Sequence, residues 1–330
     1  ARWGSNNTVI ASGGIYIAGG TDSSGNALNK IYQYDVFANN LTWVATLSES
    51  LSKHSMAAYD DSLYLFNGSR DIASFSESVT KYCVTTRTNL DSNKGYIDTT
   101  ITKTVPDTGM HRTLDDNLAP VAVTNNAACT TPYGIMVAGG CAGSGLADSS
   151  SNPGTTTALI YWPHAIGGVY EETNDKLYGI SRSVPSLPEP SVDNCMVWHK
   201  GKVYCFGGTK TSGASEFHLP FIFNFETNTW SNANSAILGV GHLKRRKAAA
   251  VSFGDEIFLF GGECSVTTSF AVAWNTSTNV VREVFSAPPA KLGKYNVSAA
   301  AFGSHIYLFG GRDSVNPSDG AKNGIYRFTP

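Results

Sequence analysis

The stretch KVYCFGG (202–208) decides the fold of this chain, because its pattern occurs six times along the sequence. In every copy a short turn leads into an apolar run that ends in a glycine pair, which the second copy replaces with Asn67-Gly68. Internal repeats at a regular spacing are the sequence signature of repeat architectures. The six copies are SGGIYIAGG (12–20), YDDSLYLFNG (59–68), PYGIMVAGG (132–140), WHKGKVYCFGG (198–208), FGDEIFLFGG (253–262) and FGSHIYLFGG (302–311).

The copies are spaced about as far apart as the blades of a β-propeller. The first residues of the pairs lie at positions 19, 67, 139, 207, 261 and 310, so the separations are 48, 72, 68, 54 and 49 residues. One class of propeller has a repeat of about 50 residues. The two long separations leave room for loop insertions of roughly 20 residues each.

Each repeat can be divided into four short strands, as the fourth repeat shows. Its apolar and aromatic runs cover 194–199, 202–206, 221–226 and 229–233, with Gly, Asn, Asp and Ser between them. Val, Ile, Phe, Tyr and Trp favour strands, whereas the residues between the runs favour turns. Glycine tolerates a positive φ and lets a neighbouring backbone approach closely. We therefore expect the glycine pairs to lie where neighbouring blades pack tightly.

The two ends of the chain predict how the ring closes. The last repeat shows three strand patterns between 296 and 330, and no fourth pattern follows them. Trp3 near the start of the chain matches Trp43 and Trp230, which occupy fourth-strand positions in their repeats. We therefore expect the N-terminal segment to complete the last blade, which removes the exposed sheet edges that invite aggregation.

Over nearly its whole length the chain resembles a kelch-repeat β-propeller. Besides the glycine pairs, the resemblance rests on third-strand aromatics and late tryptophans, namely Tyr34, Tyr161, Phe225, Tyr326, Trp3, Trp43 and Trp230. It implies an all-β fold of six blades in a single domain, closed by the strand around Trp3. The expected blades are approximately 5–50, 51–107, 108–185, 186–235, 236–289 and 290–330 plus 1–4. The second, third and fifth repeats lack the late tryptophan, and Trp274 falls on the third strand of the fifth repeat.

The composition agrees with one all-β domain. Hydrophobic residues make up 42% of the 330 residues, enough for a packed core, and 15% are charged, against roughly 25% in an average globular protein. The formal net charge of −2 argues against non-specific binding of nucleic acids. No apolar run approaches the ~20 residues of a membrane-spanning helix. Because Ala1 lies so close to a strand, we expect a processed chain or one domain of a larger protein or assembly.

Five Asn-x-Ser/Thr sequons bear on the cellular compartment, at Asn6, Asn40, Asn67, Asn275 and Asn296. With 24 Asn residues in the chain, chance alone predicts roughly five such motifs. Position is more informative than number. Asn40 and Asn275 fall in predicted turns between third and fourth strands, where a glycan fits, whereas Asn67 replaces a glycine of a pair and is a poor acceptor. Low charge and abundant Ser, Thr and Asn favour a secreted protein over the cytoplasmic alternative.

The six cysteines permit disulfides without requiring them. Cys195 and Cys205 lie on the two arms of one predicted hairpin, nearly opposite each other across the turn at 200–201. A non-hydrogen-bonded cross-strand pair brings its Cα atoms within the ~7 Å that a disulfide needs. The alternative is that both are free core residues, as buried cysteines often are. No Cys or His spacing resembles a zinc site, and we expect no metal or cofactor.

In the propellers that this chain resembles, ligands usually meet the face built by loops after the glycine pairs and loops entering each first strand. The charged residues expected on this face are Arg70, Asp71, His111, Arg112, Lys210, His242, Arg245, Arg312 and Asp313. Arg70 and Arg312 follow glycine pairs in separate blades, so we expect them to converge and grip a carboxylate, a phosphate or an acidic peptide. A run such as 244–247 is more often solvated than functional, and His54 fits a structural role.

The resemblance leaves three classes of function open. Kelch propellers most often serve as interaction platforms, so we favour a non-catalytic scaffold that binds a protein or glycan in an extracellular or surface assembly. The second class is an enzyme acting on sugars, because some kelch-like propellers oxidise sugars with copper and others isomerise sialic acid. The histidines form no recognisable copper cluster, whereas an isomerase needs only acid–base groups such as His111, Asp115, Asp116 or His242. The third class, a cytoplasmic adaptor or actin-binding protein, usually carries an additional helical domain.

Overall fold

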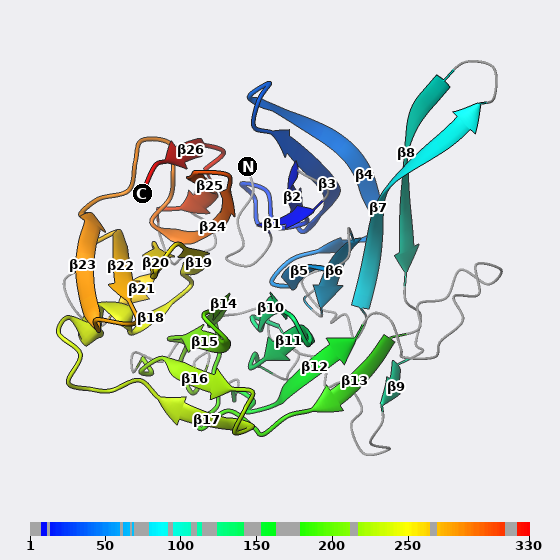
Figure 1. The fold of residues 1–330 in the computed structure, drawn as a ribbon. Coiled ribbons are helices and arrows are strands. Elements are labelled where there is room, and N and C mark those ends of the chain that lie inside the picture. Colours follow the sequence, from blue (N-terminus) through cyan, green and yellow to red (C-terminus); the bar gives the residue numbers. More distant parts are fainter. Residues whose placement is uncertain are drawn as a thin grey trace.

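A computed structural model shows a ring of small β-sheets (Figure 1). It describes residues 8–11, 14–59, 62–66, 68, 79–91, 95–106, 111–113, 124–141, 153–162, 179–211, 217–264, 269–313 and 322–330. This part of the chain contains no α-helix, and its helical structure is limited to the short 3-10 segment Val240–Leu243. The chain is therefore an all-β propeller, as the repeats predict.

Five sheets of the ring have four or more strands. The first contains β1 (Thr8–Ala11), β2 (Gly14–Ala18), β3 (Leu28–Asp35) and β4 (Asn40–Leu51), and the second contains β5 (Ser55–Tyr59), β6 (Ser62–Phe66), β7 (Val79–Asp91) and β8 (Gly95–Pro106). The third contains β10 (Ala127–Thr131), β11 (Gly134–Ala138), β12 (Ala158–Trp162), β13 (Gly179–Ser183) and β9 (His111–Thr113). The fourth contains β14 (Cys195–His199), β15 (Lys202–Phe206), β16 (Phe221–Asn224) and β17 (Thr229–Asn232), and the fifth contains β19 (Ala249–Phe253), β20 (Glu256–Phe260), β22 (Ala271–Asn275) and β23 (Val280–Phe285).

A sixth sheet has three strands, β24 (Tyr295–Phe302), β25 (His305–Arg312) and β26 (Ile325–Phe328). A two-stranded ribbon of β18 (Arg245–Arg246) and β21 (Glu263–Cys264) lies beside the fifth sheet. The predicted count of six blades is not confirmed, because a sixth four-stranded blade needs one more strand. Trp3, which the sequence assigns to that strand, lies outside the described residues, so the closure stays a prediction.

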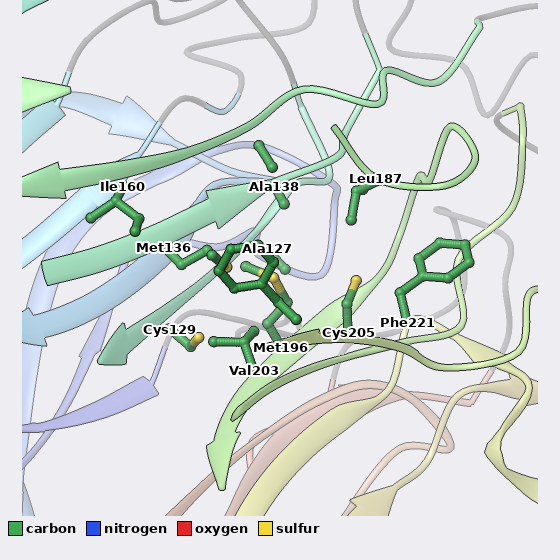
Figure 2. Close-up of a cluster of buried hydrophobic side chains, with 12 residues drawn as sticks. Ala127, Cys129, Met136, Ala138, Ile160, Leu187, Met196, Val203, Cys205 and Phe221 are labelled. Carbon is green, nitrogen blue, oxygen red and sulfur yellow. The ribbon is translucent and has the colours of Figure 1, made fainter. Parts of the chain in front are cut away.

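The innermost strands of the sheets are neighbours around the ring, in the order β1, β5, β10, β14, β19 and β24, and β24 lies beside β1. A cluster of buried apolar side chains fills the space between each sheet and the next. Figure 2 shows the cluster between the third and fourth sheets, where Met136 and Ile160 face Met196, Val203 and Phe221. Burial of apolar surface between adjacent sheets is therefore the main force that holds the ring together.

The glycine pairs lie where one sheet meets the entry loop of the next. A Cβ at Gly207 would overlap with the carbonyl oxygen of Arg245, and one at Gly139 would overlap with that of Ser191. The second glycine of a pair also donates a hydrogen bond across the boundary, as Gly208 does to the Arg245 carbonyl oxygen at 2.8 Å. Both glycines of that pair have positive φ, 60° and 78°. These contacts confirm the predicted reason for the pairs, namely close approach of neighbouring backbones.

Candidate functional site

The loops after the glycine pairs and the loops that enter the innermost strands lie at the same end of the sheets. The first two strands of each sheet are antiparallel, so the start of one lies beside the end of the other. The two loops also pair directly, since Val192 and Thr209 exchange backbone hydrogen bonds of 2.9 and 3.0 Å. Equivalent pairs are Thr124 with Cys141 and Arg246 with Glu263. The two sets of loops thus form the single face that the resemblance implies.

Five residues, each near the start of the innermost strand of the second to sixth sheets, form a chain of backbone hydrogen bonds around the centre of the ring. We call them the axial belt: Lys53, Asn125, Asp193, Lys247 and Asn296. Each has a left-handed backbone, with φ between 54° and 61°. The N–H of each belt residue after Lys53 donates to the carbonyl oxygen of the belt residue in the preceding sheet, at 2.9 to 3.0 Å. Asn and Asp visit this conformation most readily among non-glycine residues, which explains three of the five positions.

Two neighbouring side chains of the axial belt carry opposite charges and are buried. Asp193 and Lys247 are each 6% exposed, and Lys247 Nζ lies 3.9 Å from Asp193 Oδ2. A charge-assisted hydrogen bond is shorter, at about 2.7–2.9 Å. Asp193 Oδ2 accepts no hydrogen bond from the described residues. Because buried acceptors are ordinarily satisfied, this oxygen is a candidate group for binding a ligand.

Arg245, two residues before the belt residue of the fifth sheet, is a buried structural cation. Its guanidinium donates to the carbonyl oxygens of His242 (2.6 Å), Gly261 (2.8 Å), Ser269 (2.9 Å) and Phe270 (3.1 Å). Burial lowers the pKa of this guanidinium from its ordinary value, although an arginine stays protonated in proteins. Arg245 therefore braces the backbone of the face rather than reaching a ligand.

Arg246, the next residue, is held by an acidic side chain on the neighbouring loop. Its Nε and Nη2 lie 2.8 and 2.7 Å from Glu263 Oε2, and the guanidinium carbon lies 5.9 Å from the centre of the Phe217 ring. Arg246 is 7% exposed, and its Nη1 donates no hydrogen bond within the described part of the chain. One edge of a fixed guanidinium is thus buried without an acceptor among the described residues.

The loops of this face carry more cations than acids at the positions nearest the axial belt, although the whole chain has a net charge of −2. The positions nearest the belt are the four residues that end one residue after each belt position, together with the residue after each glycine pair. In the described residues these positions carry six cations and two acids. The cations are Lys53, Arg245, Arg246, Lys247, Lys294 and Arg312, and the acids are Asp193 and Glu263. Such an excess attracts anionic ligands.

Arg312 does not occupy the surface position that the sequence predicts. Its side chain is 1% exposed, so it is a core residue at the end of β25. It directly follows its glycine pair, whereas Arg70 is the second residue after its own pair, so the two are not equivalent in the repeat. Arg70 and Asp71 lie outside the described residues. Arg312 therefore cannot form the expected surface site in which two arginines, Arg70 and Arg312, hold one anionic ligand.

His111 and Arg112 lie elsewhere than predicted. They belong to β9, which pairs in parallel with β13 at the outer edge of the third sheet. The innermost strand of that sheet is β10, and the loop that enters it contains Asn125. The sequence misplaces the two residues because a long insertion separates the second and third glycine pairs, which shifts the start of the third blade.

Three other predicted residues lie around the face. Lys210 is exposed and its Nζ lies 3.2 Å from Glu189 Oε2. Asp313 is exposed and its Oδ2 lies 2.6 Å from Lys322 Nζ. His242 is half-buried in the 3-10 segment, and its Nδ1 makes no hydrogen bond with the described residues. Lys210 and Asp313 are thus paired with charged neighbours on the same face, and none of the three residues belongs to the axial belt.

The predicted disulfide between Cys195 and Cys205 is wrong. In the β14–β15 hairpin, Cys195 lies opposite Phe206 and Cys205 lies opposite Met196, so the two cysteines are one residue out of register. Successive side chains of a strand point to opposite faces. Cys205 therefore packs between the third and fourth sheets (Figure 2), whereas Cys195 packs between the fourth and fifth. Both are free thiols, and burial raises the pKa of Cys205 to about 12.

The sequons differ in exposure. Asn40 is exposed at the start of β4, and Asn275 is half-buried at the end of β22, where its Oδ1 accepts hydrogen bonds from the N–H groups of Ser277 and Thr278. Asn296 is a belt residue and is 6% exposed, so its amide is not accessible to a glycan in the folded chain. Asn6 lies outside the described residues. Glycosylation at Asn40 and Asn275 stays a prediction.

The residue after each belt position fills the boundary with the preceding sheet. His54 is buried against Gly19 and Gly68, and this burial lowers the pKa of its imidazole to about 4. Asn194 occupies the same position in the fourth sheet, and its Nδ2 lies 3.5 Å from the carbonyl oxygen of Ala138. The expected structural role of His54 therefore agrees with its burial.

The sequence-based prediction missed Asn125 and Asp193, and it treated Asn296 only as a sequon. A signal for them does exist. Asn or Asp stands at the same distance before the glycine-paired strand in three of the repeats, and these residues favour left-handed backbone. A recurring Asn or Asp at one repeat position predicts a conserved backbone shape, which here is the axial belt.

No known protein-family model matches the chain, and no curated protein is significantly similar to it. Within the described ranges, no helix is long and apolar enough to cross a membrane. In the same part of the chain, no group of three or more His, Cys, Asp or Glu side chains is arranged to hold a metal ion. The candidate site therefore rests on its own geometry.

Proposed function

We propose that the protein is a binding scaffold whose ligand, a protein or a glycan, docks on the face that carries the axial belt. The observation that supports this most directly is the excess of cations over acids at the centre of that face. The loops are also fixed by hydrogen bonds to one another and to the neighbouring sheets. A pre-ordered surface loses little conformational entropy on binding.

We further propose that the propeller is of the kelch type and has six blades. Support comes from the six repeats and from the position of the three-stranded sheet, which fills the gap between the fifth and first sheets. The fourth strand of that sheet would come from the segment around Trp3. Closure by the N-terminal segment would leave no open edge in the ring.

An extracellular or surface location belongs to the same proposal. With the Cys195–Cys205 disulfide excluded, the support that remains is the exposed sequon at Asn40, the sequon at Asn275 and the low fraction of charged residues. Mass spectrometry of the native protein before and after deglycosylation tests this directly. Glycans on either asparagine would support secretion, and bare asparagines in native material would count against it.

The proposed function is tested by charge reversal on the two ends of the propeller. Protein and glycan arrays would be probed with the purified chain and with a Lys210→Glu/Lys294→Glu variant of the belt face. The matched control is Lys200→Glu/Lys202→Glu, at the hairpin turn at the opposite end of the fourth sheet. We expect the first variant to lose binding by about tenfold or more and the control to keep it. Equal binding by both variants would overturn the proposal.

A further inference from the structure

Two buried polar atoms of opposite character lie at the boundary between the fourth and fifth sheets. Asp193 Oδ2 lacks a hydrogen-bond donor, and Arg246 Nη1 lacks an acceptor, in the described part of the chain. Both side chains are more than nine-tenths buried. An unsatisfied buried charge is costly, so each atom marks a place where a ligand atom would be stabilised.

The two residues are connected through the backbone of the face. Arg246 directly precedes the belt residue Lys247, whose N–H donates to the carbonyl oxygen of Asp193 at 2.9 Å. Lys247 Nζ also approaches Asp193 Oδ2, at 3.9 Å. Asp193 and Arg246 therefore lie at the same boundary between two sheets, with Lys247 next to both of them.

The guanidinium of Arg246 is oriented before any ligand arrives. Glu263 holds Nε and Nη2, and the Phe217 ring lies against the guanidinium. The edge that carries Nη1 is left over, and a planar guanidinium edge suits the oxygen of a carboxylate. The surrounding excess of cations, which includes Lys247, Lys294 and Arg312, favours a negatively charged group at this point.

Asp193 imposes a second requirement on the chemistry of the ligand. An ionised carboxylate is only an acceptor, so its partner must donate a hydrogen bond. A ligand with a carboxylate and a nearby hydroxyl would satisfy both Arg246 Nη1 and Asp193 Oδ2. A simple carboxylate would leave Asp193 unsatisfied, and a neutral sugar would leave the guanidinium edge without its anion.

We propose that this junction is a binding site for a hydroxylated carboxylate, with Arg246 and Lys247 holding the carboxylate and Asp193 accepting from a hydroxyl. The site deepens the proposed function and rests on it, because it identifies the chemical group of the larger ligand that the belt face recognises. The ligand need not react, since the residues named here bind and orient it.

Isothermal titration calorimetry of the full chain with D-gluconate tests the site. D-Glucose, which lacks the carboxylate, and propionate, which lacks hydroxyls, serve as matched ligands. We expect gluconate to bind with one site per chain, and both other compounds to bind at least about tenfold more weakly. Failure of gluconate to bind at concentrations of about 10 mM, or equal binding of all three compounds, would overturn the inference.

Variants then assign the binding to the named residues. Arg246→Gln and Asp193→Asn should each weaken gluconate binding by about tenfold or more. Arg282→Gln is the matched control, because Arg282 also binds one carboxylate through Nε and Nη2, that of Glu256, but lies on the outer strand β23. The unfolding temperature reports whether each variant folds, and the three-ligand comparison needs no variant at all. Unchanged affinity in a folded Arg246→Gln protein would contradict the assignment.

The outcomes separate this inference from the proposed function. If gluconate does not bind while charge reversal at Lys210 and Lys294 still abolishes array binding, the carboxylate site is wrong and the binding face stands. If gluconate binds as expected while the charge reversal has no effect on array binding, the site stands and the face is not the docking surface for a larger partner.

Discussion

The entry loops of the fourth and fifth sheets have the same backbone but different side-chain chemistry. Both place a belt residue in left-handed conformation, and both put a hydrogen-bond donor two residues before it, directed at the first glycine carbonyl of their own sheet. In the fourth sheet this donor is the Ser191 hydroxyl, 3.2 Å from the Gly207 carbonyl oxygen. In the fifth it is Arg245, whose Nη1 lies 2.8 Å from that of Gly261.

The residue after the belt position differs as well. Asn194 hydrogen-bonds across the boundary towards Ala138, whereas Ala248 makes only apolar contacts in the cluster between the fourth and fifth sheets. One backbone shape can therefore be stabilised by short polar side chains or by a buried arginine with an apolar neighbour. The fifth sheet uses the second solution, and its entry loop carries three of the six cations counted on the face.

The largest loss of stability is expected from a substitution of Gly207, where the fourth sheet meets the entry loop of the fifth. A Cβ at Gly207 would overlap with the Arg245 carbonyl oxygen, so Gly207→Ala should lower the free energy of unfolding by at least about 4 kcal/mol. Gly201→Ala is the control, because Gly201 also has positive φ but has no other atom within 4 Å of the added Cβ. It should cost about 1–2 kcal/mol for the left-handed conformation alone. Equal losses in urea unfolding would show that the close approach does not matter.

Arg245 and Ser191, the hydrogen-bond donors two residues before their belt residues, should contribute differently to the free energy of unfolding. Arg245→Met removes the hydrogen bonds to four carbonyl oxygens, of which that of Phe270 keeps the Gly261 N–H as a donor, and should cost about 4 kcal/mol. Ser191→Ala removes one hydrogen bond and should cost about 1 kcal/mol. Thermal and urea unfolding of both variants checks this. A larger loss for Ser191→Ala would reverse the comparison between the two loops.

The smallest of these differences in unfolding free energy is expected at His54, the residue after the belt position of the second sheet. This difference should depend on pH. His54, with its folded pKa near 4 against an ordinary 6.5, binds a proton more readily in the unfolded chain. Its contribution to stability is therefore complete above pH 6.5 and is lost as the pH falls towards 4, by up to about 3 kcal/mol.

His54→Asn installs the side chain that the fourth sheet uses at the same position. Between pH 7 and pH 5 the wild-type protein should lose about 2 kcal/mol more unfolding free energy than this variant. Urea unfolding at the two pH values measures the difference, and every other titrating group is common to both proteins. The same loss in both proteins would show that His54 is not held neutral by burial.

Much of the fold could be predicted from local pattern. The strand predicted over 202–206 coincides with β15, and those over 194–199 and 229–233 differ from β14 and β17 by one residue at one end. Trp274 lies on the third strand of its sheet as expected. A strand is indicated by apolar residues that alternate with polar ones and by turn residues on either side. Because these residues are close together in the chain, a single sequence is enough to reveal them.

The errors arise where position in space depends on a register or on an insertion. The sequence places Cys195 and Cys205 opposite each other across the hairpin, but the pairing of the two strands is shifted by one residue. Their side chains therefore point to opposite faces of the fourth sheet, and each packs against a different neighbouring sheet. His111 precedes the third glycine pair as an entry residue should, but the chain makes an edge strand there before it starts the innermost one. Arg312 looks like a surface charge because its burial depends on packing between sheets, which no local pattern records.

The axial belt has an electrostatic consequence. Its four described hydrogen bonds all point the same way around the ring, each N–H directed at the preceding sheet. The peptide dipoles in these links therefore run tangentially and turn with the ring, so they largely offset one another instead of adding along the axis as they do in an α-helix. The potential at the centre of the face is then set almost entirely by side chains. Substitutions at the belt can change which ligand is attracted while the backbone that presents it stays the same.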